Sequence, residues 1–124
     1  MTPDRFVALR KKLEKTQRQM AAILGVSLKA VHSYEQGWRT IPPHVERQML
    51  FLLSCKTPGW RTGKQCWNIM KCSMAQRKNC PVWEFHAGRM CWMINGTYCL
   101  GQPQKDWKTK MRMCQNCEVM KALI

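Results

Sequence analysis

Apolar residues in the first half of the chain recur every three or four positions, which is the spacing of one face of an α-helix. This pattern predicts four short helices before residue 55. We expect Thr2, Thr16 and Ser27 to cap the first three, because a side-chain hydroxyl can accept hydrogen bonds from backbone amides of the first turn. Gly25 and Gly37 should end the second and third helices. The predicted buried positions are Phe6, Leu9, Leu13, Met20, Ala21, Ile23, Leu24, Ala30, Val31, Tyr34, Val45, Met49, Leu50 and Leu53.

The second half of the chain shows no long periodic stretch and is punctuated by cysteine, tryptophan and glycine. The pair Pro58-Gly59 separates the two halves and is typical of a turn or short linker. We therefore expect a mainly α fold in three parts. These are a helical domain at residues 1–55, a linker at 56–62, and a small, irregular, cysteine-rich module at 63–124.

The turn Gly25-Val26-Ser27 joins two short helices inside the predicted bundle, which is the helix-turn-helix arrangement. The segment TQRQMAAILGVSLKAVHSYEQG, residues 16–37, closely resembles the Cro/CI-type (phage-repressor-like) helix-turn-helix family. Shared features are a Gln opening the second helix, a mid-helix Ala, the Leu-Gly-Val-Ser turn and an aromatic-Glu-x-Gly ending. The resemblance covers about the first 54 residues. It implies a four- to five-helix bundle that binds double-stranded DNA.

In that family the third helix lies in the major groove, and its outward N-terminal residues face the base edges. Lys29 could donate to guanine, and Leu28 could pack on a thymine methyl group. Gln17 opens the second helix and is placed for a phosphate contact. The last two residues of the predicted set follow the third helix and should touch the DNA backbone. The set is Gln17, Leu28, Lys29, His32, Ser33, Gln36 and Arg39.

Charge favours the same partner. Lys and Arg outnumber Asp and Glu by 21 to 7, a formal net charge of +14 that favours a polyanion. The longest apolar run, residues 49–53, is far too short to span a bilayer, so no membrane segment is expected. Residues 1–12 contain no apolar stretch typical of a signal peptide, which predicts a cytoplasmic protein. A basic cluster near the C-terminus is either a solvated patch or a second DNA contact: Lys105, Lys108, Lys110 and Arg112.

Cysteine is unusually abundant, and seven of the eight cysteines fall between Cys66 and Cys117. In a reducing compartment such density indicates metal or redox chemistry more often than disulfides. The segments CWNIMKC and CWMINGTYC form a weak internal repeat, accompanied by a Cys-Pro pair and a final C-x2-C. Residues 66–120 resemble the two-CW domain, a small cysteine-rich bacterial module, which implies no particular chemistry. Cys55 lies outside this region and is expected to be buried.

The second half holds too few large aliphatic residues to build a core unaided, so we expect a metal to staple it. Three alternatives stay open. They are an iron–sulfur cluster, which we favour, a zinc site of four thiolates or of three thiolates with His86, and metal-free thiols or disulfides. The candidate metal ligands are Cys66, Cys72, Cys80, Cys91, Cys99, Cys114 and Cys117.

Motifs of catalysis are missing from the sequence: it has no Gly-rich phosphate loop, nucleophile elbow or His-Glu-x-x-His. We therefore predict a transcriptional regulator, not an enzyme, in which a cysteine-rich metal or redox-sensing module accompanies a DNA-binding domain. The alternative is an iron–sulfur electron-transfer protein whose helical half is only a docking domain. Whether the chain forms a homodimer is left open.

Overall fold

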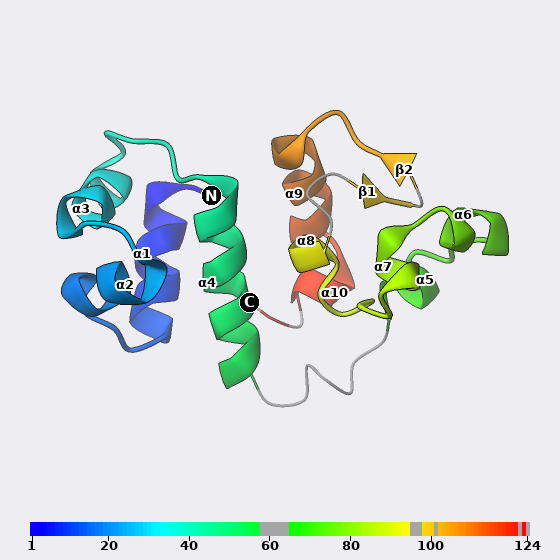
Figure 1. Cartoon of the computed structure of the whole chain (residues 1–124), viewed down its shortest axis with the longest axis horizontal. Helices are drawn as coiled ribbons and strands as arrows, with labels where there is room; N and C mark the ends of the chain where they lie inside the picture. The colour runs from blue at the N-terminus through cyan, green and yellow to red at the C-terminus, as the bar shows by residue number, and fades with distance from the viewer. Residues whose placement is uncertain (58–64, 95–97, 101, 122, 124) are drawn as a thin grey trace. The chain divides into compact units, whose positions relative to one another are not determined.

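The chain divides into two compact units, Met1–Lys56 and Thr57–Ile124, and is mainly helical (Figure 1). Each unit is described by itself in this computed structural model. The structure describes every residue except 58–64, 95–97, 101, 122 and 124.

The first unit is a bundle of four helices whose ends follow the predicted capping signals. Thr2 and Ser27 each accept a backbone amide of the helix they cap, and Thr16 forms a capping box with Gln19. Gly25 and Gly37 end their helices with φ of 70° and 77°, a left-handed conformation that glycine adopts without strain. The helices are α1 (Pro3–Lys12), α2 (Gln17–Leu24), α3 (Leu28–Gln36) and α4 (Pro43–Lys56).

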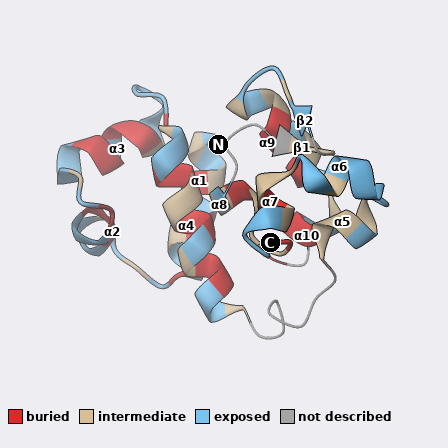
Figure 2. Cartoon of the chain, turned by 45° about the vertical axis from the view of Figure 1, so that its right-hand side comes forward, coloured by how far each residue is buried: buried red, intermediate tan, exposed pale blue. Residues whose placement is uncertain are grey.

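The core of the first unit forms where α1 packs against α3 and α4 and where α2 packs against α3 (Figure 2). Phe6 and Val31 are fully buried, and the Phe6 ring meets that of Tyr34 at a centroid distance of 5.7 Å. All but one of the predicted core positions of this unit are buried. The exception is Ile23, which is 38% exposed, because the buried face of α2 is narrower than the periodicity predicted.

Cys55 and Lys56 also differ from prediction. Cys55 is exposed instead of buried, and it borders a surface recess together with Ile23 and Leu52. Lys56, predicted to open the linker, is the last residue of α4. The helix therefore continues one residue past the predicted boundary, and the Lys56 ammonium donates to the carbonyl oxygen of Leu13 at 3.2 Å. The rest of the predicted linker, from residue 58 on, lies outside the described residues.

The second unit consists of short helices and one small antiparallel ribbon in which Cys99 pairs with Gln102. Its largest fully buried side chain is Trp92, accompanied by Val82 and Met120. The longest helix packs against the last one, which also contacts the first helix of the unit. The elements are α5 (Cys66–Ile69), α6 (Met74–Lys78), α7 (Pro81–Glu84), α8 (Cys91–Ile94), β1 (Tyr98–Cys99), β2 (Gln102–Pro103), α9 (Trp107–Gln115) and α10 (Glu118–Lys121).

Helix α9 corrects the expectation that the second half holds no long regular element. Asp106 caps it by accepting the backbone amide of Thr109 at 2.7 Å. Met111 and Cys114, three positions apart, turn one face of the helix inward. Lys110 is fully buried beside them, so it belongs to neither a solvated patch nor a DNA-contacting one.

Candidate functional site

The start of α3 is presented to solvent by the turn that follows α2. The left-handed Gly25 reverses the chain, and the Ser27 hydroxyl accepts the backbone amide of Ala30 at 3.0 Å. On the inner face of α3, Ala30 and Val31 are buried. On the outer face, Leu28, Lys29 and His32 are exposed. The outer face therefore offers an apolar, a cationic and an imidazole group within two helical turns.

Ser33 does not project like its predicted partners. Only 8% of this residue is exposed, and its hydroxyl donates to the carbonyl oxygen of Lys29 at 2.9 Å. The hydroxyl is therefore committed to the helix backbone. Ser33 still lines a surface concavity with the exposed residues of α3 and with Trp38.

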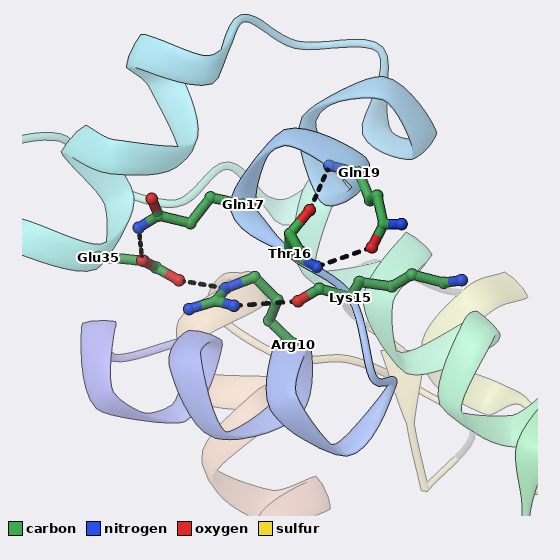
Figure 3. A network of polar contacts seen from close by, with 6 residues as sticks. All are labelled: Arg10, Lys15, Thr16, Gln17, Gln19 and Glu35. Carbon is green, nitrogen blue, oxygen red and sulfur yellow. Dashed lines mark hydrogen bonds and ion pairs between the residues drawn. The ribbon is translucent and has the colours of Figure 1, made fainter.

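Glu35 connects three helices of the first unit (Figure 3). It lies on α3 and accepts Arg10 Nε of α1 at 2.5 Å, and it also accepts the side-chain amide of Gln17 from α2. Arg10 additionally donates to the carbonyl oxygen of Lys15 at 3.0 Å. Gln17, predicted to reach phosphate, thus gives one amide N–H to Glu35. The carboxamide nitrogen of glutamine carries a second hydrogen, which leaves it a donor for DNA.

The segment after α3 carries the remaining predicted residues, and Gln36 and Arg39 are both exposed. The backbone amides of Trp38 and Arg39 donate to the carbonyl oxygen of Ser33, at 3.0 and 3.3 Å, which fixes this segment against the helix end. Trp38 is 77% exposed and was not among the predicted site residues. Its signal in the sequence is a large aromatic residue directly after Gly37, the glycine that ends α3.

The seven cysteines of the second unit converge on one cavity, although they are spread over some fifty positions of sequence. Two tryptophans, Trp67 and Trp83, also line it and meet edge to face at a centroid distance of 4.8 Å. The basic side chains in its lining are Arg77 and Lys110. The predicted ligands that line the cavity are Cys66, Cys72, Cys80, Cys91, Cys99, Cys114 and Cys117.

Cys91 contacts two other thiols of this cysteine cavity. Hydrogen bonds from the thiols of Cys114 and Cys66 lower the pKa of Cys91, against the opposing effect of burial. The same contacts, together with burial, raise the pKa of Cys66 and of Cys114 well above the ordinary thiol value. Cys66, Cys91 and Cys114 are therefore one hydrogen-bonded group of thiols, and a thiolate is the form that binds metal.

Lys110 places a cation beside these thiols. Its ammonium donates to the carbonyl oxygen of Cys91 at 3.0 Å. Burial lowers the pKa of Lys110, while the nearby Cys91 and Cys114 oppose that shift. A buried ammonium favours negative charge nearby, so this lysine suits a cavity that holds thiolates.

The described residues contain no group of three or more His, Cys, Asp or Glu side chains arranged to hold a metal ion. His86, weighed as a fourth zinc ligand, is exposed and borders a different recess with Gln65 and Arg89. The structure thus gathers the cysteines without arranging them around one point.

The comparisons with known proteins concern the first unit. A helix-turn-helix family model matches residues 7–44. This match supports the predicted helix-turn-helix in the N-terminal part, and with it a regulator that binds double-stranded DNA. The predicted two-CW domain lies outside the match and stays a prediction. Searches of curated proteins and of solved structures gave no match. Across the described residues, no helix has the length and apolar character needed to cross a membrane.

Proposed function

We propose that the chain is a sequence-specific DNA-binding transcriptional regulator that reads the major groove with α3. The observation that carries the proposal is the outer face of α3, where Leu28, Lys29 and His32 are exposed at the start of a helix-turn-helix recognition helix. The Glu35 contacts support it, because they hold α3 against α1 and α2. An interface that is already ordered in the free protein loses less conformational entropy when it binds DNA.

Lys29 provides the test. A lysine that meets a guanine edge contributes to the choice of base, whereas a lysine on phosphate strengthens binding to every sequence alike. We expect Lys29→Ala to lose about 1–3 kcal/mol of discrimination between a selected and a random duplex. The measurement is fluorescence anisotropy with both duplexes at several salt concentrations. The duplex is first selected from a random pool by the parent chain.

Lys78→Ala is the matched control, because it removes the same charge from an exposed residue of α6 in the other unit. It should leave discrimination unchanged. If Lys29→Ala discriminates like the parent, the docking of α3 is wrong. The electron-transfer alternative is tested in the same titrations. DNA binding through several phosphates weakens steeply as salt rises, whereas an electron carrier with a docking domain need not bind duplex.

We further propose that the cysteine cavity binds a metal centre, with an iron–sulfur cluster as the first candidate and zinc as the alternative. The convergence of all seven cysteines on one cavity beside Lys110 supports this. Four thiolates on such a centre give a net charge of about −2, which a buried ammonium partly offsets.

The test compares Cys91→Ser with Cys55→Ser after anaerobic purification. Cys91 lines the cavity and contacts Cys66 and Cys114, whereas Cys55 is exposed on α4 and lies outside the cavity. We expect the parent chain and Cys55→Ser to contain iron and to absorb visible light, and we expect Cys91→Ser to lose most of both. Colourless protein containing zinc would assign the alternative. Metal-free parent protein would contradict the metal centre altogether.

This centre would make the second unit a sensor of metal or redox state. Separately, we propose that the chain acts as a homodimer that binds two half-sites of DNA. The second unit has a thin core, so loss of the metal should unfold much of it. Affinity for the selected duplex should then fall after chelation while non-specific binding persists. If metal-loaded and chelated protein bind the selected duplex with equal affinity, the metal has only a structural role. The oligomeric state is measured separately, by sedimentation.

A further inference from the structure

Trp38 is the most exposed of the large apolar side chains in the described part of the chain, at 77%. Its position is nevertheless fixed, because its backbone amide donates to Ser33 at the end of α3. An indole held in water by a fixed backbone leaves a large apolar surface unburied in the free protein. Covering that surface is therefore favourable for a partner that can reach it.

The indole belongs to a concavity that both apolar and basic side chains line. Leu28, 37% exposed, lines it together with Trp38, and Lys29 and His32 line it from the same helix. Leu28 and His32 are four positions apart, so they lie on one face of α3. The concavity is thus continuous with the proposed DNA-reading face.

Among the residues that the structure describes, no acidic side chain lines this concavity. Three of the four carboxylates of the first unit have cationic partners, Glu35 with Arg10, Glu14 with Lys56 and Glu46 with the terminal amine. A partner seated there therefore meets an apolar wall inside a positive field. Duplex DNA fits both, because its phosphates are anionic and each thymine presents a 5-methyl group in the major groove.

We propose that the concavity lined by Leu28 and Trp38 binds the 5-methyl group of a thymine in duplex DNA. The inference rests on the proposed function and deepens it: Trp38 becomes a specificity-determining residue outside the recognition helix. Lys29 and His32, which line the same concavity, contact the neighbouring phosphates or base edges. The indole and the leucine together exclude water from the methyl group.

The experiment replaces each thymine of a selected duplex, one at a time, by uracil, which removes only the 5-methyl group. Affinity of the full chain is measured for the parent, Trp38→Ala and Phe51→Ala. Trp38 is largely in water, so its truncation leaves the core of the unit intact. Phe51 is the matched control, since it is also an exposed aromatic of the first unit but lies outside the concavity.

We expect uracil at one position to weaken binding of the parent about fourfold, the value of one methyl group taken out of water. Phe51→Ala should show the same loss, and Trp38→Ala should show none at that position. If no duplex is selected at all, the proposed function fails and this inference fails with it. If a duplex is selected but uracil has no effect that depends on Trp38, only the methyl site is wrong.

Two further outcomes overturn the assignment. If 5-methylcytosine strengthens binding through Trp38 while uracil costs nothing, the methyl group belongs to cytosine and not thymine. If sedimentation shows that Trp38→Ala turns a dimer into a monomer, the concavity is covered by a second copy of the chain.

Discussion

Glu35 links α1, α2 and α3 through the contacts of its side chain. Its side chain is only 6% exposed, and that of its partner Arg10 is 14% exposed. Removing one member of a fully buried ion pair costs about 3–5 kcal/mol, because the other charge is left buried without a partner. The residual exposure of Arg10 screens part of this cost. We therefore expect Glu35→Ala to lower the free energy of unfolding by about 2–3 kcal/mol in urea titrations.

Glu14→Ala serves as the control for this prediction. Glu14 also pairs with a cation, Lys56, but the two side chains are 82% and 49% exposed. Such surface pairs contribute little, so the control should stay within about 0.5 kcal/mol of the parent. Equal stability of Glu35→Ala and Glu14→Ala would show that the buried pair does not hold the helices together.

Single residues also mark where sequence patterns stop being informative. Lys110 is predicted to be on the surface, since lysine is rarely buried, yet it is fully buried next to Cys91. Ser33 is predicted to face DNA, but its hydroxyl is bonded to the helix backbone. In both cases the deciding partner is a specific carbonyl oxygen. Such a partner is visible only once the chain is folded.

At the scale of elements, the first unit could be predicted almost completely from sequence. Its caps and glycine endings are local interactions between residues three or four positions apart, so their signals lie within a short window of sequence. The turn at Gly25 therefore appears where it was expected. The predicted apolar periods place the core correctly except at Ile23.

The elements of the second unit could not be predicted from local sequence patterns. Four of its helices have only four residues each, too short for a periodic pattern to be recognised. Even α9 was missed, although Asp106 is an ordinary cap. These elements are brought together by contacts between residues far apart in the sequence, as when Cys66 and Cys114 both contact Cys91. The spacing of the cysteines in the sequence identified seven candidate metal ligands, but it could not show that they line one cavity.

At the scale of the molecule, positive charge is shared by both units. Residues 1–57 hold 10 basic and 4 acidic side chains, a formal charge of +6, and residues 58–124 hold 11 and 3, a formal charge of +8. Charge alone would therefore assign nucleic acid to either unit. The family match separates the two units, because it covers residues 7–44 of the first unit, where the outer face of α3 is exposed. We infer that the first unit carries base recognition, while the second adds electrostatic attraction.

A fragment of residues 1–57 tests this division of labour. The contacts that hold α1–α4, from the Phe6–Tyr34 ring pair to the Arg10–Glu35 ion pair, lie within Met1–Lys56. The fragment should therefore keep its helical circular dichroism and its preference for the selected duplex. Its affinity for any duplex should be lower than that of the full chain, because the basic side chains of residues 58–124 are gone.

Salt dependence separates the two contributions in this experiment. The slope of log affinity against log salt falls by about 0.9 for each phosphate contact that is lost, so the fragment should show a shallower slope than the full chain. At each salt concentration, the ratio of the affinity for the selected duplex to that for a random duplex should be the same in the fragment as in the full chain. The reason is that we assign the base contacts to the first unit. Loss of helix in the fragment would mean that the two units share one core. Loss of discrimination with the helices intact would mean that base recognition needs the cysteine-rich unit.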